Sequence, residues 1–164
     1  MKLYLIRHAP AEEPSQTAPA VDDERTLTEK GKSRMVRAAA ALKRLNVRPE
    51  LILTSPLKRA LETAALVAEG LGNIRVETLA ELAPGAELSA LTAAIRAHHA
   101  LNELALVGHQ PDLGRLAAFL IAGAPDACEV AIGKGGVALV SGDFAAPARF
   151  TLGWLLLPRM LRRL

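Results

Sequence analysis

The sequence predicts a doubly wound α/β domain, on the evidence of three patterns. Short, unbroken apolar runs recur along the chain, and such runs are typical of strands buried on both faces of a parallel sheet. Amphipathic helical spacing fills the intervals between them, as expected of layered α/β folds. Two further apolar segments near the end indicate an antiparallel pair added to the sheet. The runs lie at residues 3–6, 51–53 and 104–107, and the final pair at residues 137–140 and 150–157.

Helix-start and helix-stop signals frame four helices between these strands. The first has Thr28 as its N-cap and Glu29 in its first turn. The second is entered through Ser55 and Pro56, as N-cap and first helical position. The fourth ends at Gly123. The four patterns fall at about residues 29–45, 57–68, 88–98 and 111–122.

Length and composition exclude several classes of function. The chain of 164 residues has the length of one domain, so we expect residues 1–164 to fold as a single unit. Aromatic residues make up only 3%, too few for a platform on which bases stack. Three of the 20 cations are Arg159, Arg162 and Arg163, and without them Lys+Arg equals the 17 Asp+Glu. The body of the domain is therefore neutral, and we expect no nucleic-acid partner.

No segment suggests secretion or a membrane. Arg7 and His8 end the first apolar run, which is shorter than the core of a signal peptide. No later run approaches the roughly 18 residues of a membrane span. We expect a cytoplasmic monomer with no membrane partner, and we expect the basic tail at residues 159–163 to be a frayed terminus. The single cysteine, Cys128, is expected to be a small buried apolar side chain rather than a metal ligand.

Chemically capable side chains follow three of the predicted strands directly. Arg7 and His8 end the first strand, Arg59 lies in the helix after the second, and His109 follows the third. In open α/β sheets ligands collect beyond the carboxyl ends of the strands, so we expect these four side chains to converge.

Two imidazoles and two guanidinium groups without an acidic cluster suit a phosphoryl group better than a metal ion. Guanidinium forks match phosphate oxygens, and each contact at ~4 Å is worth about 4 kcal/mol before desolvation at an effective dielectric of 20. The N-termini of the helices at Pro56 and Pro111 would direct further backbone donors at the anion. An imidazole whose lone pair is held free can act as a nucleophile.

Four motifs in this order resemble the histidine phosphatase superfamily and, within it, the small phosphohistidine phosphatases of the SixA type. The resemblance covers roughly residues 3–157, and its most specific part is the long string that begins at Ser55. The motifs are Leu5-Ile6-Arg7-His8, Arg25-Thr26-Leu27-Thr28 with Gly31, Ser55-Pro56-Leu57-Lys58-Arg59-Ala60-Leu61-Glu62-Thr63 and Val107-Gly108-His109.

The resemblance implies a three-layer α/β/α fold like that of phosphoglycerate mutase, with a mixed, mostly parallel sheet, and a single catalytic domain without a metal or other cofactor. It implies that His8 is the nucleophile, that Arg7 and Arg59 clamp the phosphoryl oxygens, and that His109 donates to the same group. The implied substrate is phosphohistidine on a phosphorylated protein, a histidine phosphotransfer or carrier domain. Two alternatives remain open, a small-molecule phosphomonoesterase acting on sugar or nucleotide phosphates and a non-catalytic phosphoprotein-binding module.

The general acid is open among several carboxylates. Glu81 lies where members of the family often keep a proton donor, and its other interpretation is a solvated loop acid. Glu12, Glu13 and Asp22, in the loop after the first strand, are further candidates. If the substrate is phosphohistidine, no acid is needed, because the leaving imidazole has a pKa near 6.5.

Two departures and two further cations complete the expectations. Ala9 stands where the family has glycine, and we expect only a modest backbone adjustment there. The chain lacks the extra segments with which larger members cover a sugar phosphate, so an open site for a protein side chain is favoured. Arg25 either orients substrate or anchors the loop before Thr28. Lys134, ahead of two glycines, is expected on a surface turn, with a position facing the site as the alternative.

Overall fold

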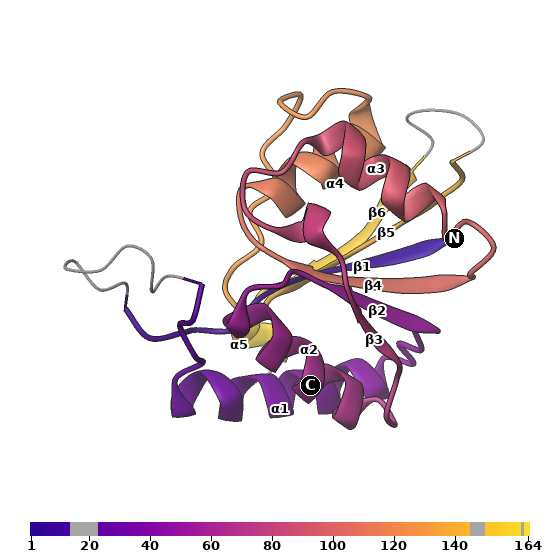
Figure 1. Ribbon diagram of the computed structural model, residues 1–164. Coiled ribbons are helices and arrows are strands. Elements are labelled where there is room, and N and C mark those ends of the chain that lie inside the picture. Colours follow the sequence, from indigo (N-terminus) through magenta and orange to yellow (C-terminus); the bar gives the residue numbers. More distant parts are fainter. Residues whose placement is uncertain (14–22, 145–149, 162) are drawn as a thin grey trace.

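Six strands form one mixed sheet in a computed structural model, which describes residues 1–13, 23–144, 150–161 and 163–164 (Figure 1). The strand order is β3-β2-β4-β1-β5-β6. Within the described residues, no helix combines the length and the apolar character needed to cross a membrane. The strands are β1 (Lys2–Arg7), β2 (Leu51–Thr54), β3 (Val76–Thr78), β4 (Glu103–Gly108), β5 (Val137–Gly142) and β6 (Phe150–Leu156).

The predicted mixed, mostly parallel sheet is confirmed. Strands β3, β2, β4 and β1 are parallel neighbours, and β5 and β6 continue the sheet in antiparallel pairing. The edge strand β3 was not predicted. It has three residues, Val76, Glu77 and Thr78, with both outer residues exposed, so it carries no apolar run that could signal a strand.

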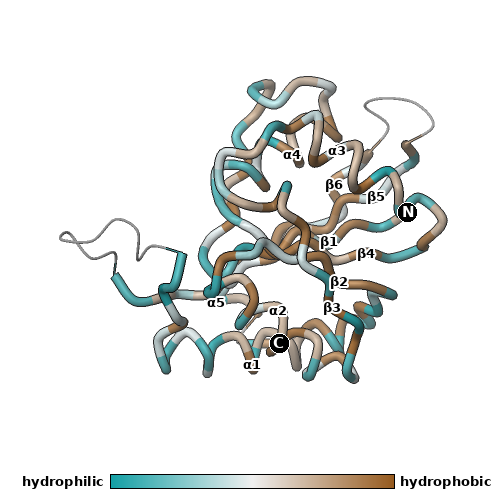
Figure 2. Tube along the Cα trace, in the orientation of Figure 1, coloured by the Kyte–Doolittle hydropathy of each residue, from teal (hydrophilic) through white to brown (hydrophobic). Residues whose placement is uncertain are grey.

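Helices cover both faces of the sheet, which confirms the three layers. In Figure 1, α1, α2 and α5 lie below the sheet, and α3 and α4 lie above it. A hydrophobic core lies on each face of the sheet, and β1 contributes side chains to both. Tyr4 and Ile6 pack with the helices of one face, and Leu3 and Leu5 with those of the other. Figure 2 shows the hydrophobic colour concentrated along the central strands. The helices are α1 (Glu29–Arg44), α2 (Lys58–Gly70), α3 (Leu88–Arg96), α4 (Asp112–Ala122) and α5 (Pro158–Leu161), with the 3-10 turn η2 (Ala80–Leu82).

Two of the predicted helix ends are confirmed and one is wrong. The side chain of Thr28 accepts a hydrogen bond from the N–H of Gly31, as an N-cap does. Gly123 ends α4 in the left-handed conformation, with φ of 81°. The second helix, however, begins at Lys58 with Leu57 as its N-cap. Ser55 is left outside the helix, where its hydroxyl contacts a histidine described below.

Other boundaries also differ from the expectation. Helix α3 ends at Arg96, because the N–H groups of His98 and His99 bond three residues back in tight turns. Helix α4 begins at Asp112, with Pro111 as its N-cap after a cis peptide bond.

Two further expectations were wrong. Cys128 is exposed, because it lies in the irregular segment after α4 rather than on a core-facing element. The C-terminal segment is not frayed throughout: it forms α5, and Leu161 is only 1% exposed in the same core cluster as Met35 of α1. A guanidinium nitrogen of Arg44 also donates to the carbonyl of Leu164 at 2.9 Å.

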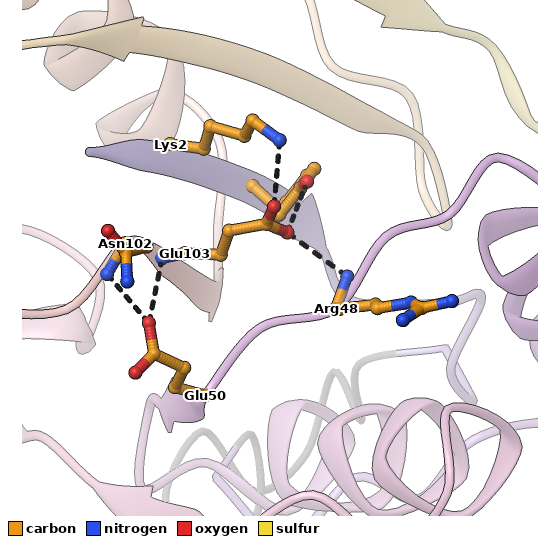
Figure 3. Close-up of polar contacts among 6 residues, drawn as sticks. Lys2, Arg48, Glu50, Asn102 and Glu103 are labelled. Carbon is orange, nitrogen blue, oxygen red and sulfur yellow. Dashed lines mark hydrogen bonds and ion pairs between the residues drawn. The ribbon is translucent and has the colours of Figure 1, made fainter.

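A polar network closes the end of the sheet at which β1 and β4 begin. Figure 3 shows the carboxylate of Glu103 accepting hydrogen bonds from the Lys2 ammonium and the Arg48 backbone N–H, at 2.7 and 3.1 Å. The hydroxyl of Tyr4 donates to the same carboxylate at 2.8 Å. Burial opposes ionisation of Glu103, but these three donors outweigh it and lower its pKa. The network is therefore structural, and it lies at the amino ends of strands whose carboxyl ends carry the site.

Candidate active site

The register of the sheet brings the ends of three strands together. Arg7 of β1 pairs with Gly108 of β4, and the next residue, His8, donates its N–H to the Gly108 carbonyl at 3.0 Å. On the other side of β4, Ser55 donates its N–H to the Val107 carbonyl at 2.9 Å. The segments that follow β1, β2 and β4 therefore start side by side, as predicted for a site at this edge.

The two histidines after β1 and β4 are neighbours. The ring centroids of His8 and His109 lie 5.1 Å apart, with the ring planes at 51°. Both residues are buried, with 6% and 4% of their surface exposed. Two imidazoles thus share one partly desolvated space.

A hydrogen bond sets the tautomer of His8. Its Nδ1 lies 2.7 Å from the carbonyl oxygen of Ala9, which can only accept, so Nδ1 carries the hydrogen. In the neutral ring the other nitrogen, Nε2, then has an unprotonated lone pair. This is the state that nucleophilic chemistry at Nε2 requires.

The surroundings of His8 keep it neutral. Burial is the main cause that lowers its pKa to about 4, and the positive charges of Arg59, Arg7 and Lys134 lower it further. The hydrogen bond to Ala9 acts in the opposite direction and is outweighed. At neutral pH the ring is therefore uncharged in a strongly cationic environment.

His109 is oriented by Ser55. The Nε2 atom of His109 lies 2.9 Å from the Ser55 hydroxyl oxygen, and the Leu57 N–H donates to that same oxygen at 3.3 Å. The hydroxyl is therefore anchored by the backbone entering α2. This contact fixes the plane of the His109 ring whichever of its nitrogens carries the proton.

Two arginines complete the cationic environment. Arg59, in the first turn of α2, is 4% exposed. Arg7 donates from Nη1 to the carbonyl of Ile132 at 3.0 Å, and its buried Nε has no hydrogen-bond partner among the described residues. Burial lowers the pKa of Arg7. An unpaired buried N–H donor costs free energy, so this arrangement favours binding of an anion that accepts a hydrogen bond from Arg7 Nε.

The arrangement matches a known family. Residues 3–112 match the histidine phosphatase superfamily (branch 1). The chain belongs to this superfamily. A relative with 40% identity over 119 residues, covering 71% of each chain, is an uncharacterized protein of Picosynechococcus sp. (strain ATCC 27264 / PCC 7002 / PR-6).

Solved structures of two phosphatases share the fold. The protein histidine phosphatase SixA, complexed with tungstate, has a TM-score of 0.85 at 26% identity, covering 97% of this chain and 98% of its own. A mycobacterial glucosyl-3-phosphoglycerate phosphatase has a TM-score of 0.72 at 21% identity, covering 95% and 98%. At that lower identity the likeness extends to the fold alone.

Polar side chains of the long motif that begins at Ser55 stabilise the site through hydrogen bonds. Thr63 accepts a hydrogen bond from the Ala9 N–H at 3.0 Å and donates to the Arg59 carbonyl at 2.7 Å. Glu62 accepts from the Leu27 N–H at 2.7 Å, which ties the segment before α1 to α2. These roles of Ser55, Glu62 and Thr63 were not predicted, although three polar side chains within one specific motif were a usable signal.

Ala9 replaces the family's glycine without strain. Its φ is not positive, and its side chain is buried among core residues.

A side chain cannot be accommodated at Gly31, because a Cβ there would lie 2.1 Å from the carbonyl oxygen of Pro10. The loop after β1 thus rests directly on the first turn of α1.

The carboxylates considered as general acids differ in placement. Glu81 is half-buried on η2, after β3, and forms no hydrogen bond or ion pair with another described residue. Glu12 and Glu13 are exposed, and Asp22 lies outside the described residues. Arg25 donates to the Glu12 carbonyl at 2.9 Å, so it anchors the loop.

A hollow of about 320 Å³ lies between the start of α4 and residues 125–130. Gln110 lines it and is itself fixed, donating to the Val130 carbonyl and accepting from the Gly114 N–H. The four predicted site residues, Arg7, His8, Arg59 and His109, do not line this hollow. Among the described residues, no group of three or more His, Cys, Asp or Glu side chains is arranged to hold a metal.

Proposed function

We propose that this superfamily member is a metal-independent phosphatase that removes the phosphoryl group from phosphohistidine on a signalling or carrier protein, through a phosphohistidine at His8. The supporting observation is the state of His8, a buried neutral imidazole whose Nδ1 is committed to the Ala9 carbonyl, beside His109 and among positive charges. In this proposal residues 1–164 act as one catalytic domain.

In the first step the Nε2 lone pair of His8 attacks phosphorus. A P–N bond forms, and the bond between phosphorus and the substrate imidazole breaks, its electron pair leaving with that imidazole. The other nitrogen of the substrate ring carries a proton taken from solvent, so the ring leaves as neutral imidazole. Arg7 and Arg59 hold the non-bridging oxygens, which suit planar guanidinium forks, and His109 donates to the same group. Loss of one preorganised donor of this kind costs about 10²–10³ in rate.

In the second step a water oxygen attacks phosphorus. The bond between phosphorus and Nε2 breaks, its electron pair returns to His8, and inorganic phosphate leaves after the attacking water loses a proton to solvent. The low pKa of His8 makes it a good leaving group in this step, because the neutral ring is its stable form.

Three observations favour phosphohistidine as the substrate. Its leaving imidazole has a pKa near 6.5 and departs without a strong acid. The connection between β3 and α3, residues 79–87, is short and contains only the turn η2, which suits a site open to a protein side chain. The overall likeness to SixA, at a TM-score of 0.85, supports the same choice.

Glu81 has a conditional role in this proposal. An alkyl or sugar phosphate needs a proton on its leaving oxygen, and Glu81 would supply it from the edge of the site. Glu81→Gln should then slow turnover of alkyl phosphates by at least about tenfold and leave phosphohistidine turnover within about twofold.

A substrate panel tests the function. It contains a phosphorylated histidine phosphotransfer domain, phosphoramidate, an aryl phosphate, sugar phosphates and nucleotides. We expect the highest kcat/KM for the phosphorylated protein, loss of turnover in His8→Ala, and wild-type turnover in His99→Ala, which removes an exposed histidine after α3.

The other outcomes are equally informative. Faster turnover of sugar or nucleotide phosphates, slowed by Glu81→Gln, would identify a small-molecule phosphomonoesterase. Phosphate binding without hydrolysis of any panel member would identify a binding module. Wild-type turnover by His8→Ala would refute the mechanism, and trapped labelled phosphate on His8, labile in acid and stable in base, would identify the intermediate.

A further inference from the structure

A glycine turn is bonded to the backbone of the candidate nucleophile. The N–H of Gly135 donates to the carbonyls of both Arg7 and His8, at 3.1 Å each. The Arg7 N–H donates to the carbonyl of Gly136 at 3.2 Å, and the turn is closed by a 2.7 Å bond from the Gly136 N–H to the Gly133 carbonyl. These hydrogen bonds therefore fix residues 133–136 relative to the end of β1.

Glycine is required for this close approach. Gly135 has a φ of 78°, which side chains rarely adopt. A Cβ on Gly136 would lie 2.9 Å from the Gly133 carbonyl oxygen and 3.1 Å from that of Leu156. With glycine at three of its four positions, the turn carries a single side chain, that of Lys134.

The charge of Lys134 acts on the site without being neutralised nearby. The residue is exposed and forms no ion pair with another described residue. Its ammonium is nevertheless close enough to His8 to help lower the pKa of that ring. Arg7 and Arg59, by contrast, are fixed by burial or by backbone contacts.

We propose that Lys134 is a third phosphoryl-binding cation, whose ammonium contacts a non-bridging oxygen of the group that occupies the His8 site. The inference rests on the proposed function for its substrate and deepens it. Two arginines form the fixed floor of the site, and an exposed lysine on a rigid turn reaches the anion from the rim. A flexible ammonium on a firmly placed backbone can follow the phosphoryl group as it passes from substrate to His8.

Binding of inorganic phosphate tests the inference without requiring turnover. Lys134→Ala and Lys134→Gln should weaken phosphate binding, measured by calorimetry, by about threefold to tenfold, the range expected for one partly solvated charge pair. Lys134→Arg should restore it to within about twofold. Lys43→Ala is the matched control, because it removes an exposed lysine from the last turn of α1 with the same change in net charge.

A second readout reports the location of the ammonium. Loss of the positive charge should raise the pKa of His8, followed by NMR, in Lys134→Ala and Lys134→Gln and not in Lys43→Ala. Wild-type phosphate affinity in Lys134→Ala, an equal loss in Lys43→Ala, or no phosphate binding by the wild-type protein would each overturn the inference. Phosphate binding that depends on Lys134 in a protein without turnover would instead refute only the proposed function.

Discussion

The hydroxyl of Thr63 accepts a hydrogen bond from the backbone N–H of Ala9, at 3.0 Å, in a fully buried position. Ala9 also supplies the carbonyl to which His8 Nδ1 donates. The same hydroxyl donates to the Arg59 carbonyl. One buried side chain therefore holds the backbone of the candidate nucleophile against the helix that carries Arg59.

Thr63→Val removes this link while keeping the shape of the side chain. The Ala9 N–H is then buried without a partner, so we expect a loss of about 1–3 kcal/mol in the free energy of unfolding. Turnover of an aryl phosphate should fall as well, because His8 loses its support. Urea unfolding and steady-state kinetics measure the two effects. Thr63→Ser, which keeps the hydroxyl, is the control, and equal losses in both variants would contradict the role given to the hydroxyl.

Gly31→Ala should disturb the contact between α1 and the loop after β1. The new Cβ would lie 2.1 Å from the Pro10 carbonyl oxygen, so the backbone must move, at a cost of about 1–3 kcal/mol in unfolding free energy. Helix propensity alone predicts the opposite sign, because alanine favours helix. Thermal and urea unfolding decide between them. Ser33→Ala, at an exposed position in the same helix, should be nearly neutral.

The sequence predicted the elements that carry a strong local signal. The three apolar runs became β1, β2 and β4, and the Thr28 cap and the Gly123 stop lie where expected. Strand β3 was not predicted, because its three residues, with both outer ones exposed, show no hydrophobic periodicity. Residue type misled the prediction for Cys128, since a cysteine is exposed when its segment faces no core.

The location of the candidate site was predictable from the sequence, whereas the side chains that hold the site residues in place were not. Arg7 ends β1, His8 and His109 directly follow β1 and β4, and the carboxyl ends of parallel strands lie at one edge of a sheet. The contacts of Thr63 with Ala9 and of Ser55 with His109 span 54 residues each, and they depend on how α2 crosses that edge. The packing of Leu161 on the α1 side likewise depends on a core cluster whose members come from distant parts of the chain.

Glu103→Gln should lower stability without changing turnover. The amide cannot match three donors as the carboxylate does, so we expect a loss of about 1–3 kcal/mol at pH 7. Because folding lowers the pKa of Glu103, its contribution is present above the pKa of the unfolded chain and is lost as pH falls through the folded pKa. The difference between wild type and Glu103→Gln should therefore shrink in acid.

The control for this network is Lys2→Met. The variant removes one partner of Glu103. Because the Lys2 side chain is 51% exposed, the loss in unfolding free energy should be less than about 1 kcal/mol. Urea unfolding at several pH values gives both comparisons. Turnover should stay at the wild-type level in both variants, since the network lies at the opposite edge of the sheet from His8. A Glu103→Gln variant with a constant stability deficit down to pH 3 would contradict the ionic contribution.

The pKa of His8 should make its protonation visible in both titration and stability. Folding lowers this pKa from 6.5 to about 4, so between these values the unfolded chain binds a proton that the folded protein rejects. The free energy of unfolding should therefore fall as pH drops from 6.5 to 4, by about 3 kcal/mol from this group, and its contribution should be flat above and below that window.

His8→Asn isolates this contribution, because the carboxylates that titrate in the same range are common to both proteins. The wild-type protein should lose about 3 kcal/mol more than His8→Asn between pH 7 and pH 4 in urea unfolding. NMR of the wild-type protein should place the His8 titration near pH 4. Parallel stability profiles, or a His8 titration near 6.5, would show that the ring is hydrated and free to accept a proton, and a neutral nucleophile would then no longer be enforced by the fold.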